Sequence, residues 1–263
     1  MPDPAPTDIE LWLVDDRDVS DPGLLEQYLA LLSPMETGRH QRFVFPHDRN
    51  QFLVARALVR TVLGQYLEQD PASLVFSQTA HGKPCLAHES PLQFNLTHTR
   101  GMIVLAVTTG APLGVDVEYK SRVADVAKLT ERYFSPAEAS ALYELPVELW
   151  NERFFDLWTL KEAYVKGCGT GLHTPLRYFS FGFTDSAISI AFSGPLEDDP
   201  RAWQFWQMSI DDRFRLALAI NDTPDTAYRI TARKGLPLAS FQELTLPVLR
   251  QSITGSSPGS ERR

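Results

Sequence analysis

The chain has 263 residues, a formal net charge of −8 at pH 7 and two cysteines, Cys85 and Cys168. The acidic balance argues against a general nucleic-acid binder, which normally carries a basic surface. Two cysteines provide no disulfide framework. No apolar run approaches the roughly 18 residues that span a bilayer, and the start MPDPAPTDIE lacks the basic and apolar stretches of a signal peptide. We therefore expect a cytoplasmic protein with neither nucleic-acid nor membrane partners.

The first part of the chain combines strand and helix signals. Ser33-Pro34-x-Glu36 has the residues of a helix N-cap followed by proline at the first helical position. Asp48 can cap a long amphipathic helix that reaches Leu67. After a lead-in over 1–8, we predict strands over 9–14, 74–76, 94–97 and 102–107, helices over 24–32, 33–43 and 48–67, and a turn over 81–84.

The second part begins after the chain break Gly110-Ala111-Pro112. Ser135-Pro136-x-Glu138 repeats the earlier cap and introduces another helix. The tail from Ser252 is of low complexity and is expected to be disordered. We predict strands over 113–119, 178–183, 188–192, 203–210 and 214–220, and helices over 123–133, 135–145 and 148–167.

The order of elements in the second part repeats that of the first. The two Ser-Pro-x-Glu caps lie 102 residues apart, and each precedes a long helix. This repeat predicts an α+β fold, a pseudo-dimer of two similar halves with the site in the cleft between them. We place the N-terminal half at 1–112, the C-terminal half with its metal site at 113–251, and a disordered tail at 252–263.

Three acids and two lysines lie in apolar frames. In GVDVEY, Asp116 and Glu118 share one face of a predicted strand. In FFDLWTLKEAYVK, Glu162 and Lys166 share one face of a helix that has little solvated surface. Buried charges need an opposite charge, and oxygen ligands suit Mg²⁺ or Mn²⁺. A metal holding a phosphate-bearing substrate is one interpretation; a polar sheet edge and an ordinary surface ion pair are the others.

Further candidates could hold an anionic ligand. Thr97 and His98 stand at a predicted strand end, where hydroxyl and imidazole can contact a phosphate, although an isolated histidine is more often structural. Lys83 lies in the restrictive turn Gly82-Lys83-Pro84. Local positive charge comes from five arginines that could equally form a solvated helix face: Arg39, Arg42, Arg49, Arg56 and Arg60.

In this order and spacing, the motifs resemble those of the Sfp-type 4′-phosphopantetheinyl transferases. The resemblance covers roughly residues 33–175 and is carried by the Arg-rich helix, FSQTAHGKPCL, FNLTHTRGMIVLAV, GVDVEY and FFDLWTLKEAYVKGCGTGL. It implies a monomeric enzyme that transfers phosphopantetheine from coenzyme A to a serine of an apo acyl, aryl or peptidyl carrier protein. Adenosine 3′,5′-bisphosphate would be released, with Mg²⁺ or alternatively Mn²⁺ as cofactor.

The resemblance also implies residue roles. Asp116, Glu118 and Glu162 are similar to the family's Mg²⁺ ligands, and Glu162 also to its base. Lys166 is similar to the lysine on the diphosphate, and Lys161 to a second motif lysine; Asp116, Glu162 and Lys166 form the catalytic set. The coenzyme A contacts also include the adenine-side turn and a 3′-phosphate group: Gly82, Lys83 and Pro84, then Thr97, His98 and Arg39. Glu36 departs from the pattern, because some members carry a phosphate-binding lysine there.

Two other functions stay open on the residues alone. Glu118-Tyr119-Lys120 has the acid-x-lysine form of a Mg²⁺-dependent nuclease, although Asp116 lies unusually close to it. A carrier-binding module without catalysis would be expected to have a broken acidic triad. Carrier recognition is expected from apolar residues of 115–145 with nearby Arg122, Lys128 and Arg132, since such carriers are acidic.

Overall fold

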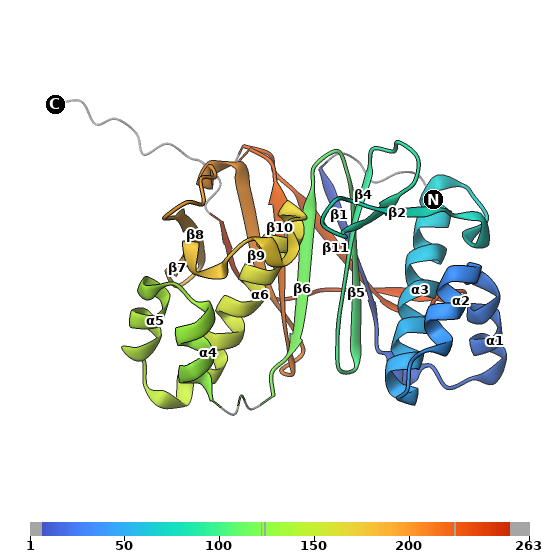
Figure 1. Ribbon diagram of the computed structural model, residues 1–263, viewed down its shortest axis with the longest axis horizontal. Helices are drawn as coiled ribbons and strands as arrows, with labels where there is room; N and C mark the ends of the chain where they lie inside the picture. Colours follow the sequence, from blue (N-terminus) through green and yellow to red (C-terminus); the bar gives the residue numbers. More distant parts are fainter. Residues whose placement is uncertain (1–6, 122, 124, 224, 253–263) are drawn as a thin grey trace.

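A five-stranded sheet and a six-stranded sheet form the centre of the computed structural model, with helices at both ends (Figure 1). The structure describes residues 7–121, 123, 125–223 and 225–252. The first part of the chain forms β1 (Asp8–Val14), α1 (Pro22–Leu31), α2 (Pro34–Gln41), α3 (Pro46–Leu67), β2 (Phe76–Gln78), β3 (Pro84–Leu86), β4 (Leu92–Thr99) and β5 (Met102–Thr109).

The second part repeats this plan and then returns to the first sheet. Its elements are β6 (Leu113–Tyr119), α4 (Val126–Tyr133), α5 (Pro136–Tyr143), α6 (Trp150–Cys168), β7 (Phe179–Phe183), β8 (Ala187–Phe192), β9 (Trp203–Ile210), β10 (Phe214–Asn221), β11 (Arg229–Gly235), β12 (Phe241–Leu244) and β13 (Val248–Ser252). Over the described residues, no helix is both long and apolar enough to cross a lipid bilayer.

The two halves share a strand order. The first sheet runs β12-β11-β1-β5-β4, and the second runs β6-β10-β9-β13-β8-β7. In each half the opening strand pairs antiparallel with the last strand of a hairpin, β1 with β5 and β6 with β10, and that strand pairs with its hairpin neighbour. This correspondence agrees with the two-half α+β fold predicted from the repeated caps.

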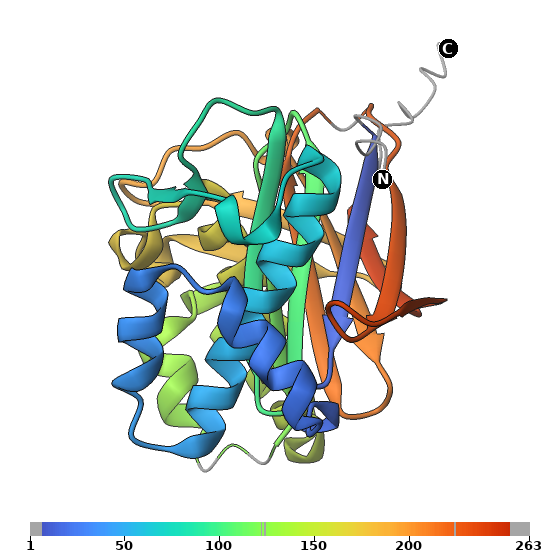
Figure 2. The same cartoon turned by 90° about the vertical axis from the view of Figure 1, so that its right-hand side faces the viewer.

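Each half has an apolar layer of its own, and a third layer joins the two halves. One lies between α3 and the first sheet, around Leu58, Val62 and Ile103. A second lies between α6 and the second sheet, around Leu160 and Phe205. The third is shared, because alternate residues of strands in both sheets meet in it: Leu11, Val104, Val117, Met208 and Leu216 among them. Figure 2 looks onto α1–α3, which cover the outer face of the first sheet.

Both predicted Ser-Pro-x-Glu caps are present. Ser33 accepts from the amide of Glu36 at 3.3 Å while the Glu36 carboxylate accepts from the Ser33 amide at 2.9 Å, which makes a capping box. Ser135 and Glu138 form the same pair. The Asp48 prediction is wrong: α3 begins at Pro46, and its N-cap residue makes no side-chain bond.

Strands β11, β12 and β13 are absent from the predicted elements. β11 pairs parallel with β1, with Leu11 opposite Ala232, so a segment from the C-terminal part of the chain belongs to the N-terminal sheet. The predicted boundary at 112/113 therefore separates the two halves only up to β10. Ser252 ends β13 rather than beginning a tail, and 253–263 lie outside the described residues.

Candidate active site

Strand β6 and helix α6 approach closely enough for their backbones to touch. A Cβ added to Gly114 would lie 2.1 Å from the Ala163 carbonyl oxygen and 2.2 Å from the Gly167 nitrogen. Only glycine fits such a contact. This approach puts the acids of β6 beside the Glu162–Lys166 end of α6, so the local sequence GVDVEY positions the site as well as supplying its carboxylates.

Asp116, Lys166 and Thr97 form the centre of the site. The Lys166 Nζ atom lies 2.6 Å from Asp116 Oδ1 and 3.0 Å from Thr97 Oγ1, and Thr97 donates to the same carboxylate oxygen at 3.1 Å. Asp116 is buried, and its Oδ2 atom has no hydrogen-bond partner among the residues that the structure describes. A buried carboxylate oxygen without a partner is costly and is suited to accept a ligand.

Glu118 and Glu162 lie near the Asp116 charge. Burial and, after it, the Asp116 carboxylate raise the pKa of Glu118 to about 7, while bonds from Thr99 and Trp158 and the Lys166 charge oppose the change. Burial also raises the pKa of Glu162, again assisted by Asp116 and opposed by Lys166. Thr99 Oγ1 donates to Glu118 at 3.3 Å. Mutual repulsion of this kind is relieved by a bound cation.

The three carboxylates are not preassembled as a chelate. Among the described residues, no group of three His, Cys, Asp or Glu side chains is arranged to hold a metal ion. Lys166 instead neutralises Asp116 through an ion pair. The donor set fits Mg²⁺ in its chemistry, since it offers carboxylate oxygens and an unpaired Asp116 Oδ2.

The predicted phosphate side lies along β4 and α2. His98 follows Thr97 on β4; burial against the site lowers its pKa, and the Lys166 charge lowers it further. Arg39 is exposed on α2, with its guanidinium 5.3 Å from the Phe52 ring centre. Glu36 contacts Arg56 and Arg60, at 2.6 and 2.7 Å, and thus fixes α2 to α3. Its departure from a lysine therefore has a structural reason.

Arg56 and Arg60 do not belong to the solvated helix face that the five arginines could have formed. Arg60 is 1% exposed and donates to the carbonyl oxygens of Pro71 and Leu74. Arg56 is ion-paired and packs over Phe76. Of the five arginines, these two serve the core of the first half and are not available to an anionic ligand.

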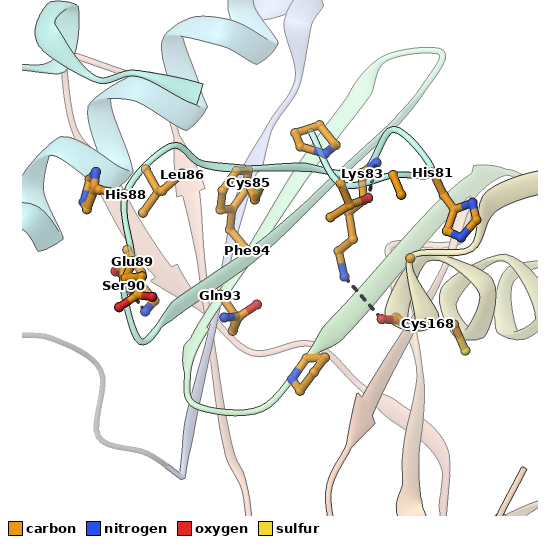
Figure 3. Close-up of a pocket in the computed structure, with 17 residues that line it drawn as sticks. His81, Lys83, Cys85, Leu86, His88, Glu89, Ser90, Gln93, Phe94 and Cys168 are labelled. Carbon is orange, nitrogen blue, oxygen red and sulfur yellow. Dashed lines mark hydrogen bonds between the residues drawn. The ribbon is translucent and has the colours of Figure 1, made fainter. Parts of the chain in front are cut away.

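A cavity of about 450 Å³ opens at the turn of the first half against the end of α6. Gly82 has φ +85°, which favours glycine, and Lys83 and Pro84 line the cavity. Lys83 extends across the cavity, as Figure 3 shows, and its Nζ donates to the carbonyls of Leu113 at 2.9 Å and Gly167 at 3.3 Å. The turn Gly82-Lys83-Pro84 is thus tied to the start of β6 and the end of α6.

Lys161 is placed away from the predicted ligands. It is 0% exposed, lies 2.8 Å from Glu138 Oε2, and donates to the carbonyls of Leu176 and Phe179 at 2.7 and 2.6 Å. These three acceptors use its three protons. We therefore correct its assignment as a coenzyme A contact: Lys161 joins α6 to α5 and β7 inside the second half.

A second cavity, of about 580 Å³, lies beside Glu162 and Lys166. Its other walls are largely apolar and include Tyr133, Trp158 and Leu176. Two of the basic residues expected to meet a carrier, Lys128 and Arg132, lie on α4, and Arg132 lines this cavity. Arg122 lies outside the described residues.

Asn95 and Thr99 are site residues that the sequence interpretation missed. Asn95 Oδ1 accepts from the Val115 amide at 3.0 Å, and Thr99 accepts from the Tyr119 amide at 3.3 Å while bonding Glu118. The available signal was the period of two in FNLTHT, which places 95, 97 and 99 on one face. Read as alternation, it would have indicated a polar face next to the acids.

Comparisons with known proteins agree with this arrangement. A model described as "4'-phosphopantetheinyl transferase superfamily" matches residues 112–219, and one described as "4'-phosphopantetheinyl transferase, N-terminal" matches 21–110. The 4′-phosphopantetheinyl transferase HetI of Nostoc sp. is 33% identical over 217 residues, 81% of this chain and 87% of its own. A Bacillus subtilis 4′-phosphopantetheinyl transferase is 33% identical, covering 87% and 96%, and Sfp of Bacillus subtilis 27% identical, covering 83% and 92%.

The chain therefore belongs to the 4′-phosphopantetheinyl transferase superfamily and is an enzyme of that class. Because matches to both family models and to Sfp extend over most of its length, it is of the Sfp type. The resemblance predicted from the motifs is thus confirmed. Membership of this family also favours the transferase over the other two functions considered, a nuclease and an inactive carrier-binding module.

Proposed function

We propose that the chain transfers 4′-phosphopantetheine from coenzyme A to a serine of an apo acyl or peptidyl carrier protein in a Mg²⁺-dependent reaction. Adenosine 3′,5′-bisphosphate is the second product. The transfer to a carrier follows from membership of the family. The observation that carries the metal and residue assignments is the unpartnered Oδ2 atom of Asp116, whose carboxylate contributes to the raised pKa values of both Glu118 and Glu162.

Asp116, Glu118 and Glu162 would hold the cation. When bound, Mg²⁺ would neutralise diphosphate oxygens and make the phosphorus more open to attack. Lys166, displaced from its ion pair with Asp116, becomes available to the same diphosphate as a compact charge. The oxygens are not preassembled around one point, so the support for these assignments comes from donor chemistry and charge.

Glu162 is the proposed base for the carrier serine. A serine hydroxyl is a weak nucleophile until a base lies within hydrogen-bond reach. Glu162 lines the cavity of about 580 Å³ together with Lys166, so a carrier serine that enters this cavity would lie beside it. Its raised pKa makes it a better proton acceptor than an ordinary glutamate.

The nucleotide end of coenzyme A is assigned to the smaller cavity and its rim. Gly82, Lys83 and Pro84 form the adenine-side turn, with Lys83 holding both halves there. His98 and Arg39 are the proposed partners of the 3′-phosphate. The lowered pKa of His98 leaves it neutral at pH 7 before an anion arrives, so Arg39 supplies the permanent charge.

Intact-mass analysis of carrier proteins tests this function. Apo acyl and peptidyl carriers are incubated with the enzyme and coenzyme A, with Mg²⁺ or with a chelator. We expect a mass increase of one phosphopantetheine arm on one serine, and only with the metal. Equal modification in the chelator would contradict the metal assignment; no mass increase on any of several carriers would contradict the transfer.

The pKa of Glu118 predicts a pH dependence of metal binding. Because the pKa of Glu118 is about 7 instead of 4.5, this side chain keeps its proton in the folded chain between pH 4.5 and 7, where the unfolded chain has lost it. The apo protein therefore loses stability as pH rises from 4.5 through 7. A metal must displace that proton, so apparent Mn²⁺ affinity should rise about tenfold from pH 6 to pH 8. Mn²⁺ titrations followed by electron paramagnetic resonance at pH 6 and pH 8 measure the two affinities. Equal affinities at both pH values would contradict this prediction.

A further inference from the structure

Strand β10 places a buried arginine opposite Glu118. In the antiparallel pairing of β6 with β10, Arg215 is the direct partner of Glu118. Directly opposed residues have Cβ atoms about 4.5–5.5 Å apart on one face of the sheet, where opposite charges can pair. Ala217, two residues further along β10, belongs to the apolar layer beneath α6, so this face is the one that α6 covers (Figure 1). Arg215 and Glu118 are therefore neighbours beneath α6.

The Arg215 guanidinium is nevertheless bound to carboxylates of α6. Its Nε atom lies 2.7 Å from Asp156 Oδ1, and a terminal nitrogen donates to Glu152 at 2.8 Å. These two acids are one helical turn apart, so they share the face of α6 that meets β10. Within the part of the chain that the structure describes, no ion pair joins Arg215 to Glu118. The guanidinium is thus drawn away from its strand neighbour.

Asp156 is the stronger of the two partners. Its side chain is 3% exposed, against 54% for Glu152, so water and salt screen its attraction for Arg215 far less. Arg250 of β13 lies 3.2 Å from the other oxygen of Asp156, and Arg153 lies 3.8 Å from that oxygen. One buried carboxylate on α6 thus holds three arginines.

Without Asp156, Arg215 would turn toward Glu118, because a buried charge that loses its partner needs another. A guanidinium on Glu118 would offset the negative charge that a divalent cation requires. Lys166 differs from Arg215 in this respect. Its side chain is 29% exposed and lines the cavity of about 580 Å³, so it can leave Asp116 for a bound diphosphate. Arg215 is buried between β10 and α6, and it would stay on Glu118.

We infer that Asp156 is a positioning residue: it holds the Arg215 guanidinium away from Glu118 and so keeps the Glu118 carboxylate available to a divalent cation. This inference rests on the proposed function, in which Glu118 is a metal ligand. It adds a residue that acts through Arg215 and not by contact with the cation. Loss of the Asp156 charge should therefore weaken metal binding.

Asp156→Asn tests this, because asparagine keeps the size of the side chain and removes its charge. Mn²⁺ titrations are followed by electron paramagnetic resonance at pH 8, where Glu118 is ionised in the wild type. We expect Mn²⁺ affinity about tenfold weaker than in the wild type. The matched control is Glu138→Gln, which removes another buried acid of the second half, 2.8 Å from Lys161, and should leave the Mn²⁺ affinity unchanged.

A second substitution decides whether the effect passes through Arg215. Asp156→Asn with Arg215→Met removes the guanidinium, so Mn²⁺ affinity should return to within about threefold of wild type. General damage to the packing would not be repaired by another buried substitution. If Asp156→Asn does not fold, Asp156→Asn with Arg250→Gln, which removes one of the arginines left without a partner, carries the same comparison with and without Arg215→Met.

The position of the guanidinium can also be measured without metal. The Glu118 carboxyl carbon is titrated by ¹³C nuclear magnetic resonance, and its signal is assigned with Glu118→Gln. In Asp156→Asn the pKa of Glu118 should fall below its wild-type value, because an adjacent guanidinium favours the carboxylate form. Adding Arg215→Met should raise it again.

Equal Mn²⁺ affinity in Asp156→Asn and the wild type would overturn the inference. A weakened affinity that Arg215→Met does not restore would also overturn it, as would a Glu118 titration that is the same in all three proteins. Failure of the wild type to bind Mn²⁺ would contradict the proposed metal site instead, and the Glu118 titrations would still decide whether Asp156 keeps Arg215 away from Glu118.

Discussion

Glu162→Gln is expected to lower kcat for carrier modification by about 10²–10³-fold, on the order of 3–4 kcal/mol of transition-state stabilisation. Glutamine keeps the size and one oxygen of Glu162 but cannot take a proton from serine. It also removes one negative charge from the set Asp116, Glu118 and Glu162. Because the pKa of Glu162 is raised by burial and by Asp116, the neutral side chain should also be tolerated without loss of fold. Affinity for adenosine 3′,5′-bisphosphate should change little.

The matched control is Glu152→Gln, an exposed position near the start of the same helix. Glutamine retains an acceptor for Arg215, which donates to Glu152 at 2.8 Å. We expect near wild-type kcat in this control, measured by intact mass over time with saturating coenzyme A and Mg²⁺. Comparable rates for Glu162→Gln and the control would remove Glu162 as the base.

Lys161→Met is expected to destabilise the folded protein by about 3–5 kcal/mol, the cost of breaking a buried ion pair by removing one partner. Methionine fills similar space but leaves Glu138 charged in the core and the carbonyls of Leu176 and Phe179 without their donor. The folded fraction, assayed at low temperature, should retain its affinity for coenzyme A. Urea unfolding and nucleotide titration measure the two effects.

A double variant distinguishes burial of a charge from other damage. Lys161→Met with Glu138→Gln removes both charges, so part of the lost stability should return. Full recovery is not expected, because the Glu138 oxygens also accept from the amides of Ser135 and Phe181. Wild-type stability in Lys161→Met, with weakened coenzyme A binding, would restore Lys161 as a ligand contact.

Local chemistry explains what the sequence could predict. The Ser-Pro-x-Glu caps depend on residues three apart, and both capping boxes form. The alternation in GVDVEY predicted that Asp116 and Glu118 lie together, and the Asp116 charge does help to raise the pKa of Glu118. The strands over 203–210 and the following hairpin partner were also predictable, because their apolar runs are buried throughout most of their length.

The errors have a common physical origin in contacts between distant segments. Lys161 is saturated by Glu138 and by carbonyls near β7, which helix periodicity alone does not reveal. Glu36 meets Arg56 and Arg60 only when α2 folds onto α3. β11 gains its place by pairing with β1 more than two hundred residues away, and its half-exposed, polar sequence carries a weak strand signal.

We propose that the carboxylates beside Lys166 hold one divalent cation. Electron paramagnetic resonance of Mn²⁺, with wild type and Asp116→Asn titrated in the presence of coenzyme A, tests it most directly. We expect one bound Mn²⁺ per wild-type chain and an affinity at least tenfold weaker in Asp116→Asn, since a neutral amide replaces the buried carboxylate. Equal Mn²⁺ affinity in the two proteins would contradict it.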